Sequence, residues 1–428
     1  MTTLERTPLT LETIWMSDEE MFERGESHEA FRILRAQDRF HWTPPTEELK
    51  GYWNLTKYED VLYVSRRPDI FGSERGIVMY EPIDENVMMN AAQNGNGKML
   101  ITMDPPRHVK LRRLVNKGFT PRAVAEMEPH IRQITTTIID RIAKKGSADF
   151  VIDVASQIPL AVICGMMGVE EKDWDLMFQL TNKVLGSADP EYQTDVPEDQ
   201  RGTQDAANLT GNMGTMQMFG FFAQQLMARR TERRDDLVSL LCDSELEGEK
   251  LSDEDILWFC FLLILAGNET TRNAMSGGLL TLCENPGERA RLQADMSLLP
   301  SAVEEILRWV SPVMHMTRIA LQDSEINGHP IKKGERVVMW YPAINRDEDV
   351  FPDPERFDIT RSPNEHLAFG IGEHFCLGAG FARLELKVLY EELFRRFPDI
   401  QMDGPVERLR STFIGGIKHL PVKFTPEK

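Results

Sequence analysis

A single cysteine near the C-terminus combines a reactive side chain with a glycine-rich setting. Cys376 lies in FGIGEHFCLG, residues 369–378, and the helical pattern ARLELKVLYEELFRRF follows it. Free N–H groups and the positive end of the dipole at a helix N-terminus lower a thiol pKa and can hydrogen-bond the sulfur. The pattern therefore makes Cys376 a candidate axial metal ligand in a loop whose glycines admit a large planar group. The alternative is an ordinary buried cysteine beside a turn.

A second group of reactive side chains interrupts a long apolar helical pattern. AGNETT, residues 266–271, places Glu269 and Thr270 after a run of hydrophobic residues. Threonine can divert a main-chain hydrogen bond and Gly267 loosens the turn, so we expect a local opening of the helix beside a ligand. A hydroxyl backed by a carboxylate can relay protons into an enclosed site, as the reduction of dioxygen requires. Alternatively, Glu269 and Thr270 cap a broken helix.

A third pattern, EEILRW, indicates a structural role rather than a catalytic one. Glu305 and Arg308 stand three residues apart, on one face of a helix. A buried carboxylate and guanidinium need further hydrogen bonds, and we expect Arg356 in FPDPERF to complete them as a three-member network. Such pairs are common on surface helices, so the value of this one lies in its position in the chain.

The composition fits one large catalytic unit spanning residues 1–428. Of the 428 residues, 41% are hydrophobic and 27% are charged, and no composition break separates domains. The five cysteines are odd in number and lack a C-x-x-C pair, which indicates neither a disulfide framework nor a zinc site. Reduced thiols and a charged N-terminus predict a cytoplasmic protein without a signal sequence or membrane anchor. The most apolar stretch, residues 256–267, is too short to cross a bilayer.

The net charge of −19 argues against nucleic acid as a partner. One short segment of this acidic chain, residues 110–122, nevertheless gathers Lys110, Arg112, Arg113, Lys117 and Arg122. A solvated helix face and a docking surface for an acidic partner are both open interpretations.

Hydrophobic periodicity predicts a mostly helical chain. The predicted helical segments are 120–145, 151–187, 203–230, 252–284, 298–310 and 376–397. Strand-like pieces near residues 52, 336 and 419 predict small sheets. Long connections at 72–100 and 186–214 are candidates for a functional role.

Together these patterns resemble the cytochrome P450 family. FGIGEHFCLG is similar at every position to the family's haem-binding loop, F-x-x-G-x-(basic)-x-C-x-G, and AGNETT is similar to its (A/G)-G-x-(D/E)-T-T. EEILRW with a later arginine is similar to its E-x-x-R network. The resemblance implies a mainly α fold with small β-sheets. In that fold haem b lies between the oxygen-binding helix at 252–284 and the helix that follows Cys376.

The same resemblance assigns roles around the haem. Cys376 would be the axial ligand of the iron, and Glu269 and Thr270 would deliver protons. The remaining cofactor-binding residues are expected to be His108, Arg112, Arg318, Phe369, Gly370, His374, Gly378 and Ala266. The four basic side chains of that set would contact the haem carboxylates, although many members carry Trp where His108 stands.

Substrate contacts are expected from the variable segments. By the resemblance, the pocket residues are Val78, Met79, Met88, Met99, Leu263, Val313, Met314 and Phe413, with Met213, Met216 and Met218 from residues 186–220. A methionine-rich lining with few cations suits a terpenoid, a steroid or an alkyl or branched lipid.

The resemblance thus implies a haem-thiolate monooxygenase that hydroxylates a lipophilic molecule with O2. Electrons would come from NAD(P)H through a separate ferredoxin and ferredoxin reductase, because the chain carries no evident flavin or iron–sulfur module. The segment 110–122 would then face the ferredoxin. A peroxide-driven peroxygenase and a non-catalytic haem-thiolate sensor remain as alternatives. The acid–threonine pair disfavours the first, and the second would need no proton relay.

Overall fold

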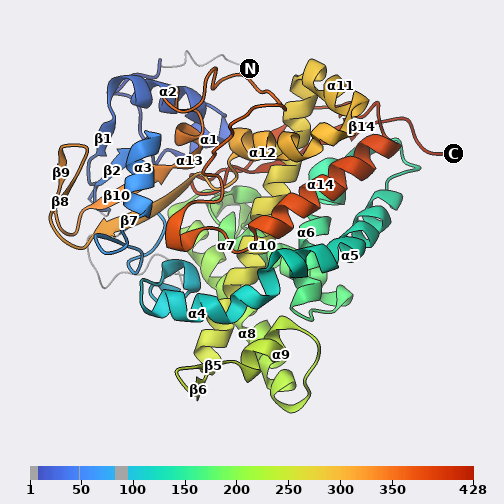
Figure 1. The fold of residues 1–428 in the computed structure, drawn as a ribbon, viewed down its shortest axis with the longest axis horizontal. Coiled ribbons are helices and arrows are strands. Elements are labelled where there is room, and N and C mark those ends of the chain that lie inside the picture. Colours follow the sequence, from blue (N-terminus) through green and yellow to red (C-terminus); the bar gives the residue numbers. More distant parts are fainter. Residues whose placement is uncertain (1–7, 48, 82–94) are drawn as a thin grey trace.

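Helices form most of the computed structural model, which describes residues 8–47, 49–81 and 95–428. The largest sheet lies at one side, beside the first helices of the chain (Figure 1). The helices are α1 Glu19–Glu23, α2 Ser27–Gln37, α3 Tyr58–Ser65, α4 Arg107–Val115, α5 Pro121–Asp140, α6 Gln157–Met166, α7 Trp174–Leu185, α8 Gln204–Thr231, α9 Leu237–Asp243, α10 Asp253–Glu284, α11 Pro286–Ala294, α12 Leu299–Val310, α13 Tyr341–Ile344 and α14 Ala379–Arg396. The predicted fold class, mainly α with small sheets, is confirmed.

The largest sheet has the strand order β1-β2-β10-β7-β3. Its strands are β1 Phe40–Thr43, β2 Tyr52–Leu55, β3 Phe71–Gly72, β7 His315–Ala320 and β10 Arg336–Trp340. β10 runs parallel to β2 and antiparallel to β7, so Val337 lies between Trp53 and Arg318. This register holds Arg318 in a central position, where its side chain is buried.

The remaining sheets have two or three short strands each. They are β4 Ser147–Asp149 with β11 Gln401–Met402 and β14 Pro421–Lys423, β5 Glu245–Leu246 with β6 Glu249–Lys250, β8 Ser324–Ile326 with β9 His329–Ile331, and β12 Glu407–Arg408 with β13 Ile417–His419. They join segments that are far apart in the sequence, because β4 pairs with β14 at the C-terminus.

The long helix α10 crosses the middle of the molecule (Figure 1). Ser252 caps its N-terminus by accepting a hydrogen bond from the N–H of Asp255. A Cβ at Gly278 would lie 2.3 Å from Oη of Tyr390 in α14, so glycine permits the close approach of these two helices. Tyr390 also donates to the carbonyl oxygen of Met275 in α10 at 2.7 Å. These contacts fix α10 against the helix that follows the cysteine loop.

Most predicted helices are present, and one is divided. The segments predicted at 120–145, 203–230, 252–284, 298–310 and 376–397 correspond to α5, α8, α10, α12 and α14. The segment predicted at 151–187 is not one helix, because α6 and α7 are separated at Gly168, whose φ is +69°. That conformation favours glycine and ends a helix. The short helices α2, α3, α9 and α11 were not predicted.

The predicted three-member ion network exists with a different third member. Glu305 and Arg308 of α12 are buried and pair at 2.8 Å. The second guanidinium on Glu305 belongs to Arg361, whose Nε lies 3.2 Å from both carboxylate oxygens. The side chain of Arg356 is 63% exposed and lies 3.8 Å from Asp358, so its predicted place in the network is wrong. Only the backbone carbonyl of Arg356 takes part, as an acceptor from Arg308 and Arg361.

Candidate functional site

The cysteine loop, residues 369–378, is held by its own backbone. The N–H of Cys376 donates to the carbonyl oxygen of Phe369 at 2.9 Å. Gly372 has a φ of +76°, and a Cβ there would lie 2.6 Å from the backbone oxygen of Ser65. Both conformation and space therefore require glycine at this position. The loop ends at the N-terminus of α14, as the sequence predicted.

An ionic cluster fixes the start of the loop against α12 and α14. The carboxylate of Glu304 accepts a hydrogen bond from Arg383 at 2.7 Å and lies 3.1 Å from Nε2 of His366. Burial alone would raise the pKa of Glu304, but the hydrogen bonds from Arg383 and His366 lower it to about 2. The guanidinium of Arg383 also lies 4.5 Å over the ring of Phe369. Glu304 therefore stays ionised, and its partner Arg383 holds Phe369 in place.

The environment of Cys376 differs from the sequence expectation. Burial raises the pKa of this thiol, whereas the N–H groups of Gly378 and Ala379 and the charges of Arg112 and Arg383 act to lower it. Burial outweighs the donors, so the expectation of a lowered pKa is wrong for the polypeptide alone. A coordinating metal cation deprotonates a thiol outright. The N–H groups directed at the sulfur can then stabilise a thiolate that the metal creates.

Cys376 opens into a cavity of about 470 Å³, which is within the size range of small-molecule sites. The opposite wall belongs to α10, where Ala266 and Thr270 are accessible although most residues around them are buried. The predicted cofactor-binding residues all line this cavity: His108, Arg112, Arg318, Phe369, Gly370, His374, Cys376, Gly378 and Ala266. The structure thus brings together residues that are up to 270 positions apart in the chain, from His108 to Gly378.

Four basic side chains gather on this wall, and Nδ1 of His108 lies 4.0 Å from the carboxylate of Glu373. Both ring nitrogens of His108 are buried without a hydrogen-bond partner among the described residues, and its ring lies 4.2 Å from that of His374. Burial and the charges of Arg112 and Arg318 lower the pKa of His108 to about 4 and that of His374 to about 2. Arg112 and Arg318 donate only to backbone carbonyl oxygens nearby. Two carboxylates, as haem carries, would supply the acceptors and charge, so these residues fit that group.

The side chains of Thr270 and Glu269 project from different sides of α10. Thr270 lines the cavity and donates from Oγ1 to the carbonyl oxygen of Ala266 at 2.8 Å. The carboxylate of Glu269 is buried and pairs instead with Arg272, which donates to Oδ1 of Asn182 in α7 at 2.8 Å. Burial raises the pKa of Glu269, and Arg272 opposes the rise. The structure therefore places Thr270, but not Glu269, on the cavity wall, and α10 is continuous through the expected opening.

In two neighbouring pairs of predicted substrate-pocket residues, one residue lines the cavity and the other does not. Val78 and Val313 line the cavity, whereas Met79 and Met314 do not. Met79 and Met314 pack in a separate core cluster with Trp340, where Sδ of Met79 lies 3.3 Å from Oη of Tyr52.

The other predicted pocket residues have mixed positions. Met99, Leu263 and Phe413 line the cavity, and Met88 lies outside the described residues. The methionines predicted from residues 186–220, Met213, Met216 and Met218, belong to α8 and do not line it. Gln204, Ala207 and Asn208 contribute from the first turns of that helix instead.

Ionisable groups that the sequence did not indicate also line the cavity wall, among them Glu385, Glu19 and Tyr80. Glu385 of α14 is buried, one of its carboxylate oxygens has no partner among the described residues, and burial raises its pKa to about 8. Glu19 and Tyr80 contact each other at 3.4 Å in another part of the wall. An acid at a core-facing position of the apolar helix pattern was the available signal for Glu385. No local pattern marked Glu19 or Tyr80.

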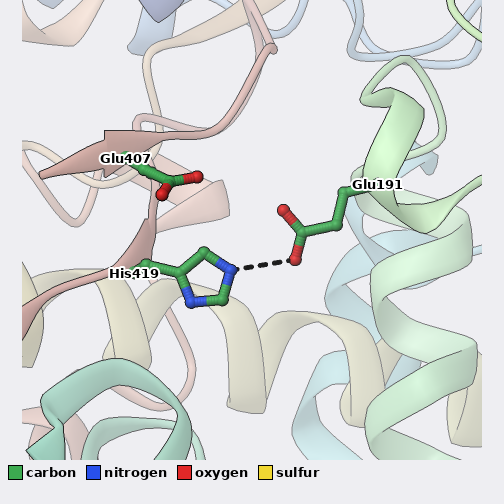
Figure 2. A group of neighbouring side chains, drawn as sticks. All are labelled: Glu191, Glu407 and His419. Carbon is green, nitrogen blue, oxygen red and sulfur yellow. Dashed lines mark hydrogen bonds and ion pairs between the residues drawn. The ribbon is translucent and has the colours of Figure 1, made fainter.

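A further titratable cluster lies outside the cavity wall. Glu191, Glu407 and His419 bring their polar atoms within 4.8 Å of one another (Figure 2). Nδ1 of His419 lies 2.5 Å from the carboxylate of Asp149, and its Nε2 lies 3.1 Å from Glu191. Partial burial alone would lower the pKa of His419, but these hydrogen bonds raise it. Since Lys418 also pairs with Glu191 at 3.1 Å, the cluster acts as an ionic link between η6 Pro190–Tyr192 and β13.

None of the helices in the described part of the chain combines the length and the apolar character needed to span a bilayer.

Comparisons with known proteins agree on one family. The family model for cytochrome P450 matches residues 73–415. A methyl-branched lipid omega-hydroxylase of Mycobacterium tuberculosis is 41% identical over 408 residues, which cover 92% of this chain and 90% of the relative. A steroid C26-monooxygenase of Mycolicibacterium smegmatis is 36% identical over 399 residues, covering 92% and 89%. The structure of a Mycobacterium marinum cytochrome P450 in complex with pseudoionone matches with a TM-score of 0.86 at 34% identity, covering 98% of this chain and 100% of that one.

Proposed function

Because the chain belongs to the cytochrome P450 family, we propose that it hydroxylates an unactivated carbon of a lipophilic small molecule. The single observation that carries this proposal is the cavity between Cys376 and Thr270. One wall offers a thiol and four basic groups, and the facing wall offers the hydroxyl groups of Thr270 and Thr271 in α10. Haem bound there supplies dioxygen activation, and a thiolate ligand favours cleavage of the O–O bond.

Different residues of the chain have different roles around the bound haem. Cys376 provides the sulfur ligand, held by the loop and the N–H groups at the start of α14. His108, Arg112, Arg318 and His374 bind the carboxylates and thereby set the orientation of the ring plane. The apolar residues of the wall exclude water from the reacting carbon.

The hydroxyl group of Thr270 is hydrogen-bonded at the cavity wall. Its Oγ1 donates to the carbonyl oxygen of Ala266, so the hydroxyl can accept from a water molecule while its own proton is engaged. Glu269 feeds this position only after its carboxylate leaves Arg272. Rotation of that side chain would therefore be part of proton delivery.

The proposed substrate class follows the lining and the relatives together. The named relatives act on methyl-branched lipids and steroids. Apolar side chains that could bind such molecules line this cavity, among them Val78, Met99, Leu263, Val313 and Phe413. A terpenoid, a steroid or a branched alkyl chain suits such a wall, because binding of these molecules is driven by burial of hydrocarbon.

Electrons are proposed to come from NAD(P)H through a ferredoxin and its reductase, in the cytoplasm. Arg113 and Lys117 are exposed and have no ion pair among the described residues. Arg112 hydrogen-bonds the carbonyl of Phe375, so this basic segment adjoins the cysteine loop, where the ring of Phe375 is 41% exposed. Lys110 and Arg122 are already paired with Glu247 and Glu126, which leaves Arg113 and Lys117 as the contacts for an acidic ferredoxin.

The Thr270→Ala variant tests the proposal. With ferredoxin, reductase, NAD(P)H and a bound lipophile, we expect the variant to bind haem normally but to release peroxide instead of hydroxylated product. Thr270→Ser keeps the hydroxyl and is the matched control. Equal yields of product per NAD(P)H in all three proteins would contradict the role of Thr270. Product formation from peroxide alone at the same rate would favour a peroxygenase, and no product from any lipophile would favour a sensor.

A further inference from the structure

Three side chains outside the cavity wall form a set of the kind that binds transition metals. Glu191, Glu407 and His419 each direct one polar atom toward a common space, and these atoms lie within 4.8 Å of one another (Figure 2). Imidazole nitrogen and carboxylate oxygen are both ligands of Zn²⁺ in proteins. None of the three residues lines the cavity, and the proposed hydroxylase function uses none of them.

The fold brings these residues together from two parts of the chain. Glu407 of β12 lies opposite His419 of β13 in the antiparallel register, so the two side chains share one face of the hairpin. Glu191 belongs to η6 and faces both of them from a separate segment (Figure 2). A metal ion at this point would join η6 to the β12–β13 hairpin.

A carboxylate on the other side of the imidazole ring orients His419. Nδ1 of His419 lies 2.5 Å from Oδ2 of Asp149. Oδ1 of Asp149 accepts from the N–H groups of Val151 at 3.0 Å and Leu420 at 3.2 Å, which hold this carboxylate in place. Metal-binding histidines almost always donate their second N–H to such a group, which leaves the lone pair of the other nitrogen for the metal. Asp149 thus directs Nε2 of His419 toward the two glutamates.

The distances suit a small divalent ion. Two ligands about 2.0–2.2 Å from zinc lie about 3.3–3.6 Å apart at the tetrahedral angle. Nε2 of His419 lies 3.1 Å from Oε1 of Glu191, which is close to that separation. The carboxylate of Glu407 must approach by roughly 1 Å. It can do so because its side chain is exposed and has no hydrogen bond or ion pair among the described residues.

The charges around this point favour a cation. Lys418 lies 3.1 Å from Oε2 of Glu191 and 3.1 Å from Asp189, so it leaves Oε1 of Glu191 for the ion. Four carboxylates nevertheless belong to this group, those of Asp149, Asp189, Glu191 and Glu407. A divalent cation reduces the repulsion among them.

We propose that Glu191, Glu407 and Nε2 of His419 bind one divalent transition-metal ion, with Zn²⁺ as the reference ion and water at the remaining position. The ion takes the place of the direct contact between Nε2 and Glu191. Mg²⁺ and Ca²⁺ do not suit the site, because these hard cations prefer oxygen ligands to imidazole.

The ion would link two segments that border the cavity. Ser187 and Ala188, which line the cavity, lie just before η6 in the chain. Residues 411–414, which also line it, lie between β12 and β13. An ion that binds only when η6 and the hairpin are together stabilises this part of the wall.

Calorimetric titration of haem-loaded, chelator-treated protein with Zn²⁺ tests the proposal. We expect one zinc ion per chain at this site, and no binding of Mg²⁺ or Ca²⁺. Glu407→Gln and His419→Ala should each weaken zinc binding by at least about 10- to 100-fold, the loss typical even of residues that only orient a ligand. X-ray absorption at the zinc edge should show nitrogen and oxygen neighbours at about 2.0–2.2 Å and no sulfur at about 2.3 Å.

Glu407→Gln is the decisive variant because no contact of the fold depends on this exposed side chain. Glu325→Gln is its matched control, since Glu325 is an exposed carboxylate of another short hairpin, β8–β9, and lies outside the cluster. Unchanged haem incorporation shows that each variant is folded, and Glu407→Gln serves if His419→Ala does not fold.

Hydrogen exchange measures the link between the two segments. At a zinc concentration 100 times Kd, an opening that separates η6 from β13 becomes about 100-fold rarer. Amides of both segments should exchange more slowly by up to that factor, whereas those of β8 and β9 should not change.

Three results would overturn the inference. They are no zinc binding by the unaltered protein, equal zinc affinity in the unaltered protein and Glu407→Gln, and sulfur among the neighbours of the bound zinc. Equal affinity would show that the cluster is an ionic link in which Glu407 has no part. Each result concerns metal binding alone and leaves the proposed hydroxylase function unaffected.

Discussion

The ion network around Glu305 predicts that substitution of Arg361 lowers the stability of the protein much more than substitution of the nearby Arg356. Glu305 is fully buried and accepts from Arg308 at 2.8 Å, from Arg361 at 3.2 Å and from Asn364 at 3.1 Å. Arg361 also donates to three backbone carbonyl oxygens of residues 352–356, at 2.7 to 3.1 Å. The Arg361→Ala substitution thus removes one partner of a buried charge and one donor from each of three carbonyl groups. The carbonyl group of Arg356 keeps its bond from Arg308, and that of Asp353 keeps its bond from the N–H of Arg356.

The expected cost follows from that list of contacts. Arg308 still compensates the charge of Glu305, so Arg361→Ala loses hydrogen bonds to a charged group and should lower the free energy of unfolding by about 1.5–3 kcal/mol. Arg356→Ala should cost about 0–1 kcal/mol, because its side chain is 63% exposed and, among the described residues, makes one ion pair, at 3.8 Å. The backbone carbonyl of Arg356 that serves the network remains in this variant.

Urea unfolding of both haem-loaded variants measures the difference. Tryptophan fluorescence is a suitable signal because Trp309 packs under Arg308 and Arg346 beside the network. The absorption of the bound haem reports on the cysteine loop, which follows this segment in the chain. Equal losses for the two variants, or a loss below about 1 kcal/mol for Arg361→Ala, would refute the assignment of Arg361 to the network.

Two further predictions concern pH. The pKa of Glu385 rises on folding from 4.5 to about 8, so the folded chain keeps a proton that the unfolded chain releases and stability falls as pH rises between these values. At about 1.4 kcal/mol for each pKa unit, the loss of stability is about 5 kcal/mol. Glu385→Gln should remove most of this dependence of stability on pH. Parallel stability–pH curves for the unaltered protein and the variant would contradict the prediction. The pKa of His419 is raised above 6.5, so its contribution is complete below pH 6.5 and is lost as pH rises through the folded value. His419→Gln should cost under about 1 kcal/mol and only on the acidic side, and a cost that is independent of pH would argue against the ionic link.

The site could be predicted where a short local pattern carries the chemistry. The cysteine loop places its ligand, its glycines and the following helix within ten residues, so backbone conformation alone brings them together. The four basic residues that line the cavity were also found, although they come from α4, β7 and the loop itself. Only the resemblance to a family connected these distant positions.

The sequence could not predict which way neighbouring side chains point. Met79 and Met314 follow cavity-lining valines, but their own side chains pack in another core cluster with Trp340. Glu269 turns to Arg272, which stands three residues later and satisfies its charge inside the helix bundle. Such choices depend on packing between elements that are distant in the sequence.

The central claim is that the sulfur of Cys376 binds haem iron as a thiolate, and carbon monoxide tests it most directly. Reduced, haem-loaded protein treated with carbon monoxide should show the red-shifted absorption band of thiolate ligation. Cys376→Ala should abolish that band, whereas Cys283→Ala, which removes another partly accessible cysteine, should retain it. A band that is missing from the unaltered protein, or that persists in Cys376→Ala, would contradict the account.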